Sequence, residues 1–543
     1  MLRVGIMLDS YTSNAWVAKV IEEIQSSGFA RAELVILISD SPRESSLLRN
    51  FQFALFRLFE RWDYQRNKSD HDAMAPVDVS SLLNGIALIS VEANYSFTDG
   101  ISENSEDRLT EIGKHELDVI FHFGSSIPPK GILTASRYGV WSFHHGCTSE
   151  RRGGAPFFEE FAKGNPVSES SLLMFTDSLE HGRVVYKSYA STDQVSLYVN
   201  RNPIYWKTAE FALRGLRELY TGGAAFIQSL PTYREGEKSS RRSSEPTNLR
   251  MIFFTRRYLS LWLQARRTMM RSGPRAKWFI ALRKRGAGLR FDDPAGYSLM
   301  PCPTDRFYAD PFLFEKDGRT FLFFEDFRYA ENRAVISCCE LGPDGTPGSP
   351  VEVLRCPFHL SYPFVFEHAG EIYMIPETKE NRMVELYRAT SFPTGWVSEA
   401  VLLNDVYAVD ATVQEIDGRF WMFAGVSNGN FSNCDELCLF FADELTGPWT
   451  PHAANPVLSD VRRSRPAGRL FYDEGRLIRP SQDCGKAYGY ALLFSEVLTL
   501  NETEYEERQI SRLEPGVVAG CSHTHTYNRT EQFEVVDRTL AGR

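Results

Sequence analysis

Five sites in the second half of the chain share one pattern, and this repeat restricts the possible fold more than any other feature. Each site has a short apolar or aromatic run, a polar turn and a second β-rich run, and the sites begin at Ala309, Tyr362, Asp410, Pro466 and His523. Their spacing, roughly 47 to 57 residues, is close to that of propeller blades. Four sites have a Gly-containing turn, which is a hairpin signal. The repeat predicts an all-β five-bladed propeller, whose ligands usually lie near the central channel.

Length and charge indicate more than one domain. A chain of 543 residues is too long for one core, so two or three domains are expected. The net charge is −10, yet residues 231–290 carry 16 Lys and Arg against 3 Asp and Glu. We find no run of about 18 apolar residues, so no transmembrane segment is predicted. The N-terminus lacks a full signal-peptide core, and the nine cysteines lack zinc-site spacing, so reduced thiols in the cytoplasm are expected.

The first 225 residues have the pattern of an α/β domain. Short apolar runs alternate with segments of helical periodicity, which predicts a mainly parallel, doubly wound sheet. Ligands of such sheets bind beyond the carboxyl ends of the strands. The expected strands are 4–8, 32–39, 86–91, 118–123 and 138–143.

Residues 226–275 are interpreted as a basic linker that contains an amphipathic helix at 249–270. The helix combines aromatic and aliphatic residues with several arginines. It either rests on an anionic membrane or packs against one of the domains. We prefer packing, because local charge alone is weak evidence for a membrane. The propeller is expected to occupy 276–543, with 277–284 as an outer strand that closes the ring.

In the first domain, a strand that ends at Phe143 places His144 at the edge of the sheet. A Gly-rich turn then leads into a helix that begins near Pro156, since proline suits the first helical turn. A histidine at a strand end, oriented by a carboxylate, is the arrangement that a general base requires.

The segment from Asp118 to Val185 resembles the 10-formyltetrahydrofolate-dependent formyltransferases, which act on methionyl-tRNA, glycinamide ribonucleotide or amino sugars. Their pattern is Asn-x-His-Pro-Ser, then Arg-Gly-x-x-Pro, then Leu-Asp-x-Gly. The resemblance implies His144 as the catalytic histidine, with Ser142 in place of the family asparagine and Glu180 in place of the aspartate. It implies 10-formyltetrahydrofolate as cofactor. The implied cofactor contacts are Phe123, Ile127, Arg152, Gly153 and Gly182.

The second half resembles the five-bladed propellers of arabinanase- and xylosidase-type glycosidases, and the propeller attached to plant glucosamine inositolphosphorylceramide transferases. Ala309-Asp310-Pro311-Phe312 carries this resemblance, which implies an acidic residue on the inner strand. Such acids can hydrolyse a glycosidic bond, bind a sugar or cap the channel structurally. No metal site is predicted from the His-x-His pair. The candidates for the propeller axis are Asp310, Glu325, Glu377, Asp410, His523 and His525.

These features predict a carbohydrate-related protein. The first hypothesis is formyl transfer to the amine of a nucleotide-linked amino sugar in surface-glycan synthesis. A tRNA acceptor is not expected, because a propeller stands in place of the basic C-terminal barrel of the tRNA-acting enzymes. The alternatives are a non-catalytic carbohydrate-binding scaffold, and a glycosidase or glycosyl-transfer activity in the propeller.

Overall fold

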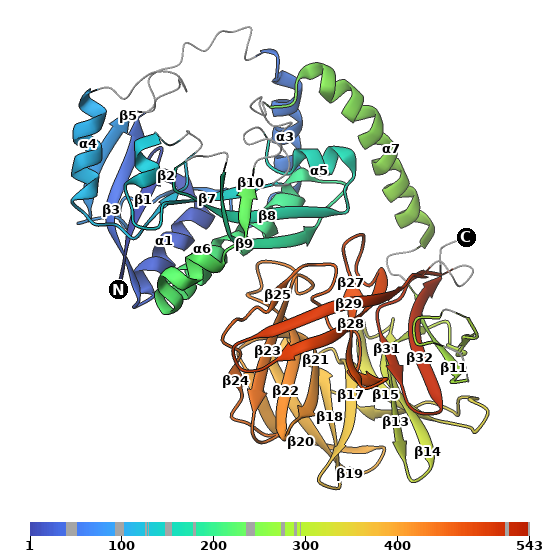
Figure 1. The fold of residues 1–543 in the computed structure, drawn as a ribbon. Coiled ribbons are helices and arrows are strands. Elements are labelled where there is room, and N and C mark those ends of the chain that lie inside the picture. The colour runs from blue at the N-terminus through green and yellow to red at the C-terminus, as the bar shows by residue number, and fades with distance from the viewer. Residues whose placement is uncertain are drawn as a thin grey trace. The chain divides into compact units, whose positions relative to one another are not determined.

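The boundary between the two units of the chain falls inside one long helix, α7 (Asn248–Ser272) (Figure 1). In this computed structural model the first unit is Met1–Leu263 and the second is Gln264–Arg543. The described residues are 1–39, 51–92, 103–124, 128, 130–146, 155–177, 181–234, 245–272, 277–286, 290–293, 295–515 and 521–540.

An eight-stranded sheet forms the centre of the first unit, in the order β10-β9-β8-β7-β6-β1-β3-β5. The five predicted strands are present and pair in parallel as β5, β3, β1, β6 and β7. The strands β8, β9 and β10 extend the sheet in antiparallel fashion. The bounds are β1 (Leu2–Leu8), β3 (Ala30–Ser39), β5 (Ala87–Glu92), β6 (Val119–His122), β7 (Val140–His145), β8 (Val167–Phe175), β9 (His181–Ser191) and β10 (Thr232–Arg234).

The parallel part of the predicted sheet is therefore confirmed, and the three antiparallel strands, which were not predicted, make the whole sheet mixed. The connection between β8 and β9 is short, and only antiparallel strands can be joined without a long crossover. A small separate pair, β2 (Thr12–Asn14) and β4 (Pro76–Asp78), completes the strands of this unit.

Helices cover the sheet and bury its apolar side chains. On one face α1 and α6 enclose Trp16, Ile21, Trp141 and Phe211. On the other face, Ile36, Ile120 and Phe175 belong to a second cluster. The bounds are α1 (Ala15–Ser26), α3 (Ala54–Asn67), α4 (Glu103–Gly113), η1 (Lys130–Thr134), α5 (Phe158–Lys163) and α6 (Leu197–Ser229).

Helix α7 packs against the first unit through one of its faces. Phe254 and Tyr258 are buried and contact Phe59 of α3 and Phe161 of α5 through their rings. Arg250 pairs with Glu159 of α5. Packing, one of the two alternatives for this helix, is thus observed. Among the described residues, every helix is too short or too polar to span a bilayer.

Five antiparallel sheets form the second unit, which confirms the predicted five-bladed propeller (Figure 1). Blade 1 is β13 (Arg306–Lys316), β14 (Arg319–Arg328), β15 (Arg333–Leu341) and β16 (Val351–Leu354). Blade 2 is β17 (Ser361–His368), β18 (Glu371–Glu377), β19 (Met383–Ser391) and β20 (Gly395–Asn404), and η2 is Lys379–Asn381. Blade 3 is β21 (Tyr407–Ile416), β22 (Arg419–Ser427), β23 (Glu436–Ala442), β24 (Thr450–Pro451) and β25 (Leu458–Ser459). Blade 4 is β26 (Phe471–Asp473), β27 (Arg476–Asp483), β28 (Ala491–Leu500) and β29 (Tyr505–Leu513).

The fifth blade closes the ring with a strand from the start of the unit. It contains β30 (Cys521–His523), β31 (Tyr527–Arg529), β32 (Phe533–Leu540), β11 (Trp278–Lys284) and β12 (Ser298–Leu299). β11 pairs with β32 along its full length, from Trp278 opposite Thr539 to Lys284 opposite Phe533. The predicted closing strand at 277–284 is therefore confirmed.

Four hairpins of the propeller use two-residue turns at the predicted positions. Both turn residues have positive φ, for example Asp317 at 51° and Gly318 at 71°. This is the geometry of a type I′ turn, whose twist matches that of the flanking strands and which favours Asp-Gly and Asn-Gly pairs.

Candidate functional site

The inner strands of blades 1, 2 and 3 carry the same irregularity. Each ladder shifts register over two residues, and the first of these adopts a left-handed backbone: Asp310 at φ 47°, Tyr362 at 47° and Asp410 at 54°. A positive φ is unfavourable for residues other than glycine, and least so for Asp and Asn. Bulges of this kind re-aim side chains, and here they bring residues of different blades together. The Tyr362 N–H, for instance, donates to Asp310 Oδ2 at 3.3 Å.

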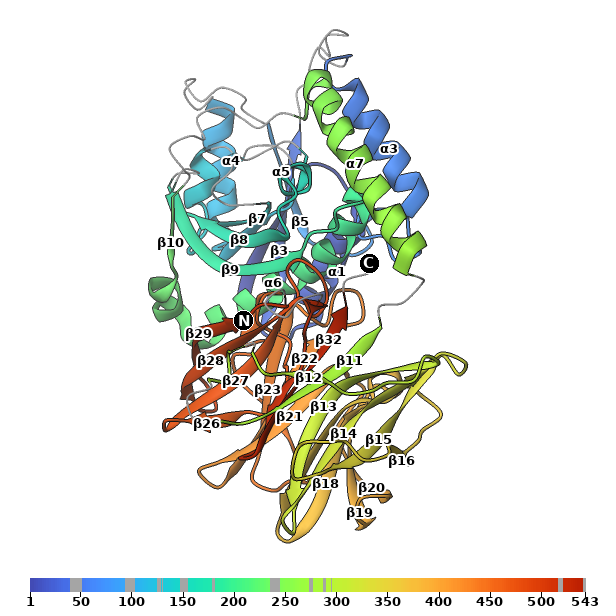
Figure 2. The ribbon, with the colours of Figure 1, turned by 90° about the vertical axis from the view of Figure 1, so that its right-hand side faces the viewer.

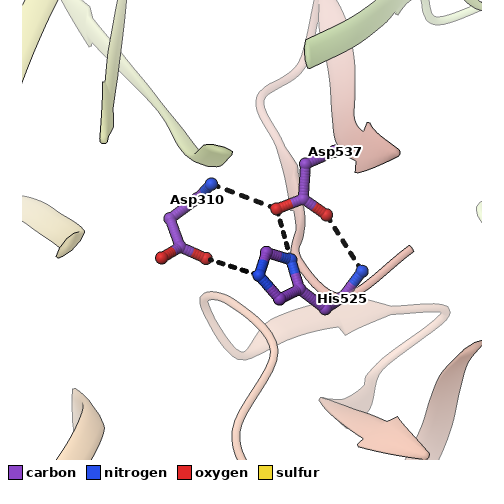
Figure 3. Close-up of side chains that lie close together, drawn as sticks. All are labelled: Asp310, His525 and Asp537. Atoms are coloured by element: carbon purple, nitrogen blue, oxygen red, sulfur yellow. Dashed lines mark hydrogen bonds and ion pairs between the residues drawn. The ribbon is translucent and has the colours of Figure 1, made fainter. Parts of the chain in front are cut away.

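Asp310 belongs to a buried group with His525 and Asp537 (Figure 3). His525 Nδ1 forms an ion pair with Asp537, and its Nε2 lies 3.7 Å from Asp310 Oδ1. Burial lowers the pKa of His525, but the two aspartates outweigh burial and raise it. The two aspartates therefore favour the protonated form of His525.

These three side chains have the donor types of a metal site, since their ligand atoms lie within 4.8 Å of one another. Hydrogen bonds already engage the same atoms, however. Asp537 accepts the backbone N–H groups of Asp310, His525 and Thr526, and the Thr526 hydroxyl donates to Asp310 at 2.6 Å. The protonated histidine accounts for this arrangement without an added ion.

A second buried group surrounds Arg465. Its Nε donates to Asp410 Oδ2 at 2.6 Å, its Nη2 donates to Oδ1 at 3.3 Å, and Nη2 lies 3.5 Å from Glu377 Oε2. Burial and Glu377 outweigh the arginine and raise the pKa of Asp410 to about 7. Burial also raises the pKa of Glu377. The hydrogen bond between the two carboxyls raises the pKa of Asp410 and lowers that of Glu377, so the proton that they share is assigned to Asp410.

Glu325 adds a further carboxyl to the interior. It is buried, and its Oε1 lies 3.5 Å from His359 Nε2. Burial, and then the charge of Asp310, raise its pKa well above the usual range. The two groups and Glu325 together thus bring five carboxyls, on Asp310, Glu325, Glu377, Asp410 and Asp537, close to two buried cationic side chains, Arg465 and His525. Protons on some carboxyls make up for the missing positive charge.

An exposed aromatic side chain borders these groups. Tyr488 is 47 % exposed, and its ring lies edge-on to His525 with the centroids 5.3 Å apart. The Arg465 guanidinium lies 5.0 Å from the same ring. On the closing strand, Trp278 stacks on His525 with the centroids 3.9 Å apart. A partly exposed ring beside buried polar groups is a combination typical of small-ligand sites.

Five of the six predicted axis residues take part in this network, and the sixth, His523, lies at its edge beside Trp278. Asp310, Glu325, Glu377, Asp410 and His525 interact electrostatically with one another. The His523 Nδ1 instead lies 2.9 Å from the hydroxyls of Ser522 and Thr539. Sequence reasoning missed Arg465, Asp537, Trp278 and Tyr488. The one local signal was the position of Arg465, directly before the fourth repeat.

The predicted formyltransferase residues fall only partly within the described structure. His144 and Ser142 lie on β7, and Ser142 Oγ is 3.4 Å from His122 Nδ1. Phe123 is half-buried and packs against Trp16 and Phe143. Four residues lie outside the described parts: Ile127, Arg152, Gly153 and Glu180.

Two other features of this region have structural explanations. A Cβ on Gly182 would lie 2.3 Å from the Met174 carbonyl oxygen, so β8 and β9 need glycine there for their close approach. His145 is half-buried with its Nε2 3.1 Å from Thr208 Oγ1, and desolvation lowers its pKa to about 3. It is therefore neutral, and sequence reasoning did not select it.

The comparisons with known proteins concern mainly the propeller. The family "Glucosamine inositolphosphorylceramide transferase 1, N-terminal" matches residues 297–532. A glucosamine inositolphosphorylceramide transferase 1 from Oryza sativa subsp. japonica is 34 % identical over 240 residues, which are 42 % of this chain and 32 % of the relative. The chain thus spans about a third of the curated relatives that it matches. The predicted resemblance to these transferases is confirmed for the propeller, whereas the family match does not reach residues 1–296.

Two solved structures were also compared. The β-xylosidase RS223 is 14 % identical with a TM-score of 0.31, over 42 % of this chain and 90 % of that one. Glycinamide ribonucleotide transformylase 1 from Symbiobacterium toebii is 13 % identical with a TM-score of 0.28, over 41 % of this chain and 89 % of that one. Both scores are too low to support an argument, so the formyltransferase resemblance stays a prediction.

Proposed function

We propose that the propeller binds a sugar that carries an amino group, as part of glycan or glycolipid synthesis. The excess of buried carboxyls over cations among Asp310, Glu325, Glu377, Asp410 and Asp537 carries this proposal. The printed name of the plant relatives contains glucosamine, an amino sugar, which supports the same ligand class.

An ammonium group suits this interior because it would replace protons with a fixed positive charge. Burial makes each ionised carboxylate costly unless an opposite charge lies nearby. Glu325 has no arginine or lysine partner among the described residues, so its charge is the least compensated. The exposed ring of Tyr488 would contact the apolar face of the sugar.

Binding is favoured over hydrolysis by the state of Asp410. Glycoside hydrolysis needs two carboxyl groups that are free to exchange a proton or attack the sugar. Asp410 is instead held by two hydrogen bonds from Arg465 and one, at 3.0 Å, from Gln482. Asp410 is therefore not free to serve as one of such a pair.

Calorimetric titration with glucosamine, N-acetylglucosamine and glucose tests the proposal. Glucosamine should bind at least about tenfold more tightly than the two neutral sugars, since only it provides a charge worth a few kcal/mol near the carboxyls. Glu325→Gln should remove this preference. A matched control is Glu399→Gln, which alters a carboxylate on the outer strand β20 that pairs with Arg388. Equal affinity for all three sugars would refute the proposal.

Formyl transfer in the first unit is a second candidate. The observation that favours it is the position of His144 at the carboxyl end of β7, which is parallel to β6. Titration with 5-formyltetrahydrofolate should then show binding by the full chain but not by a chain that begins at Pro231. His144→Ala should abolish formyl transfer to an amino sugar. Retained activity in this variant would exclude the assignment.

A further inference from the structure

Helix α7 has two apolar faces, and only one of them packs against other described parts of the protein. Met251, Phe254 and Tyr258 form the buried face. The opposite face is exposed but is also apolar. It consists of Leu249 (65 % exposed), Ile252 (51 %), Phe253 (64 %), Leu259 (50 %) and Leu263 (44 %).

The neighbouring helix α3 repeats this arrangement. The two helices lie side by side (Figure 2), and Tyr258 contacts both Phe59 and Trp62 through its ring. At the start of α3 and along it, four large apolar side chains at helical spacing are exposed: Phe51 (73 %), Leu55 (40 %), Leu58 (66 %) and Trp62 (44 %). We call these nine residues of the two helices the α3–α7 surface.

Exposed apolar side chains are more frequent on the α3–α7 surface than on the rest of the described protein. Of the 21 large hydrophobic residues that are exposed in the described parts, nine belong to it. Scattered single residues need no explanation, but a cluster of this kind marks an interaction site.

The charge around the surface is positive. The sequence of α7 contains six arginines and no Asp or Glu. Arg256 lies among the exposed apolar residues of α7, and Arg61 and Arg66 are exposed on α3, where Arg66 lies 5.6 Å from the Trp62 ring. The nearby acids are neutralised within the protein, because Glu60 pairs with Arg201 and Glu245 pairs with Arg57.

We infer that the α3–α7 surface docks on an anionic lipid membrane. A helix with a bare apolar face and a basic flank lies in the interfacial region of a bilayer, where arginines meet lipid phosphates and Trp62 occupies the boundary that tryptophan prefers. The positive charge favours this partner over a second copy of the chain, because two identical basic surfaces repel each other. The inference is independent of the sugar-binding proposal.

Vesicle co-sedimentation of the full chain tests the inference. Vesicles of phosphatidylcholine with about 30 % phosphatidylserine should bind the protein at least about tenfold more strongly than pure phosphatidylcholine, and high salt should weaken the binding. The double variant Ile252→Glu/Phe253→Glu should lower binding to the anionic vesicles about tenfold or more. Since both side chains are exposed, the variant should fold, and circular dichroism checks this.

A matched control is Val397→Glu/Val401→Glu. These valines are similarly exposed, at 42 % and 46 %, but lie on β20 of the propeller. The control should bind vesicles like the wild type. As a second measurement, brominated phosphatidylcholine in the anionic vesicles should quench tryptophan fluorescence, and less so in Trp62→Phe.

Three results would overturn the inference. One is the absence of binding to anionic vesicles. Another is binding that Ile252→Glu/Phe253→Glu leaves unchanged. The third is a wild-type protein that does not bind vesicles but forms a dimer in sedimentation equilibrium, while Ile252→Glu/Phe253→Glu is monomeric. That last result would assign the surface to a second copy of the chain.

Discussion

At the scale of single residues, the propeller interior depends on backbone conformations that few residues adopt. The left-handed positions are Asp310, Tyr362 and Asp410. The sequence pointed to the two aspartates because each lies at the start of a repeat, but it gave no indication of the bulge. Tyr362 was not selected, although its hydroxyl lies 2.8 Å from Thr412 Oγ1 and accepts the Gly468 N–H.

Loss of Arg465 should destabilise the propeller strongly. Arg465→Met should lower the free energy of unfolding by about 3 to 5 kcal/mol, because it leaves the buried Asp410 without its cation. Urea unfolding measures this. Adding Asp410→Asn should recover part of the loss, so the double variant should be more stable than the sum of the two single changes predicts. Strictly additive effects would show that the pair is not coupled.

The shared proton of Glu377 and Asp410 makes stability depend on pH. The folded-state pKa of Asp410 is about 7, above the ordinary carboxyl value. Between about pH 4 and 7 the folded pair therefore holds a proton that the unfolded chain lacks, and stability falls as pH rises. Glu377→Gln removes the neighbouring carboxylate that raises the pKa of Asp410, so it should weaken this pH dependence. Relative to the variant, the wild type should lose up to about 1.4 kcal/mol per pH unit in this window. Urea unfolding at pH 5 and pH 7 tests this, and parallel pH profiles would contradict it.

At the scale of elements, the sequence predicted hairpins better than long-range pairings. The propeller turns are local, and residues such as Asp317 and Gly318 favour one turn type. The strands β8 to β10 were not predicted, although β8 and β9 are long and regular. Their region was interpreted from motif residues, and Gly182 was assigned to the cofactor although close packing of β8 and β9 explains it.

The closing strand β11 lies outside the family match, which begins at residue 297, yet it completes blade 5. A propeller that begins at Lys277 should fold, whereas one that begins at Tyr297 should melt about 10 °C lower or more. The shorter chain exposes the edge of β32 and loses the buried Ile280 and Leu282, as well as the ring that stacks on His525. Thermal unfolding of the two fragments measures the difference, and a synthetic peptide of residues 277–299 should restore part of it. Equal melting temperatures would show that β11 is dispensable.

At the scale of the whole molecule, the sequence predicted the repeated blades but not the contacts between residues that lie far apart in the chain. Five blades were visible because each is a local unit with its own turn. The network around Asp310 and Asp410 was predicted only in part, because some partners come from distant segments. Asp537 lies 227 residues from Asp310, and Arg465 lies 55 residues from Asp410. No local pattern encodes such a contact. The blades must close before these residues meet.

The two units have separate cores, so heating should produce two calorimetric transitions. Variants assign them. Arg465→Met should lower only the propeller transition, and Gly182→Ala only the other, because its Cβ would collide with the Met174 carbonyl oxygen.

If the propeller binds amino sugars, glucosamine at about 100 times its Kd should stabilise that unit by about 2.7 kcal/mol and leave the other transition in place. If glucosamine shifts only the transition of the first unit, the sugar site would have to be assigned to that unit. A single transition that both variants lower would mean that the units unfold together, and the sugar-binding unit would then have to be identified from Glu325→Gln.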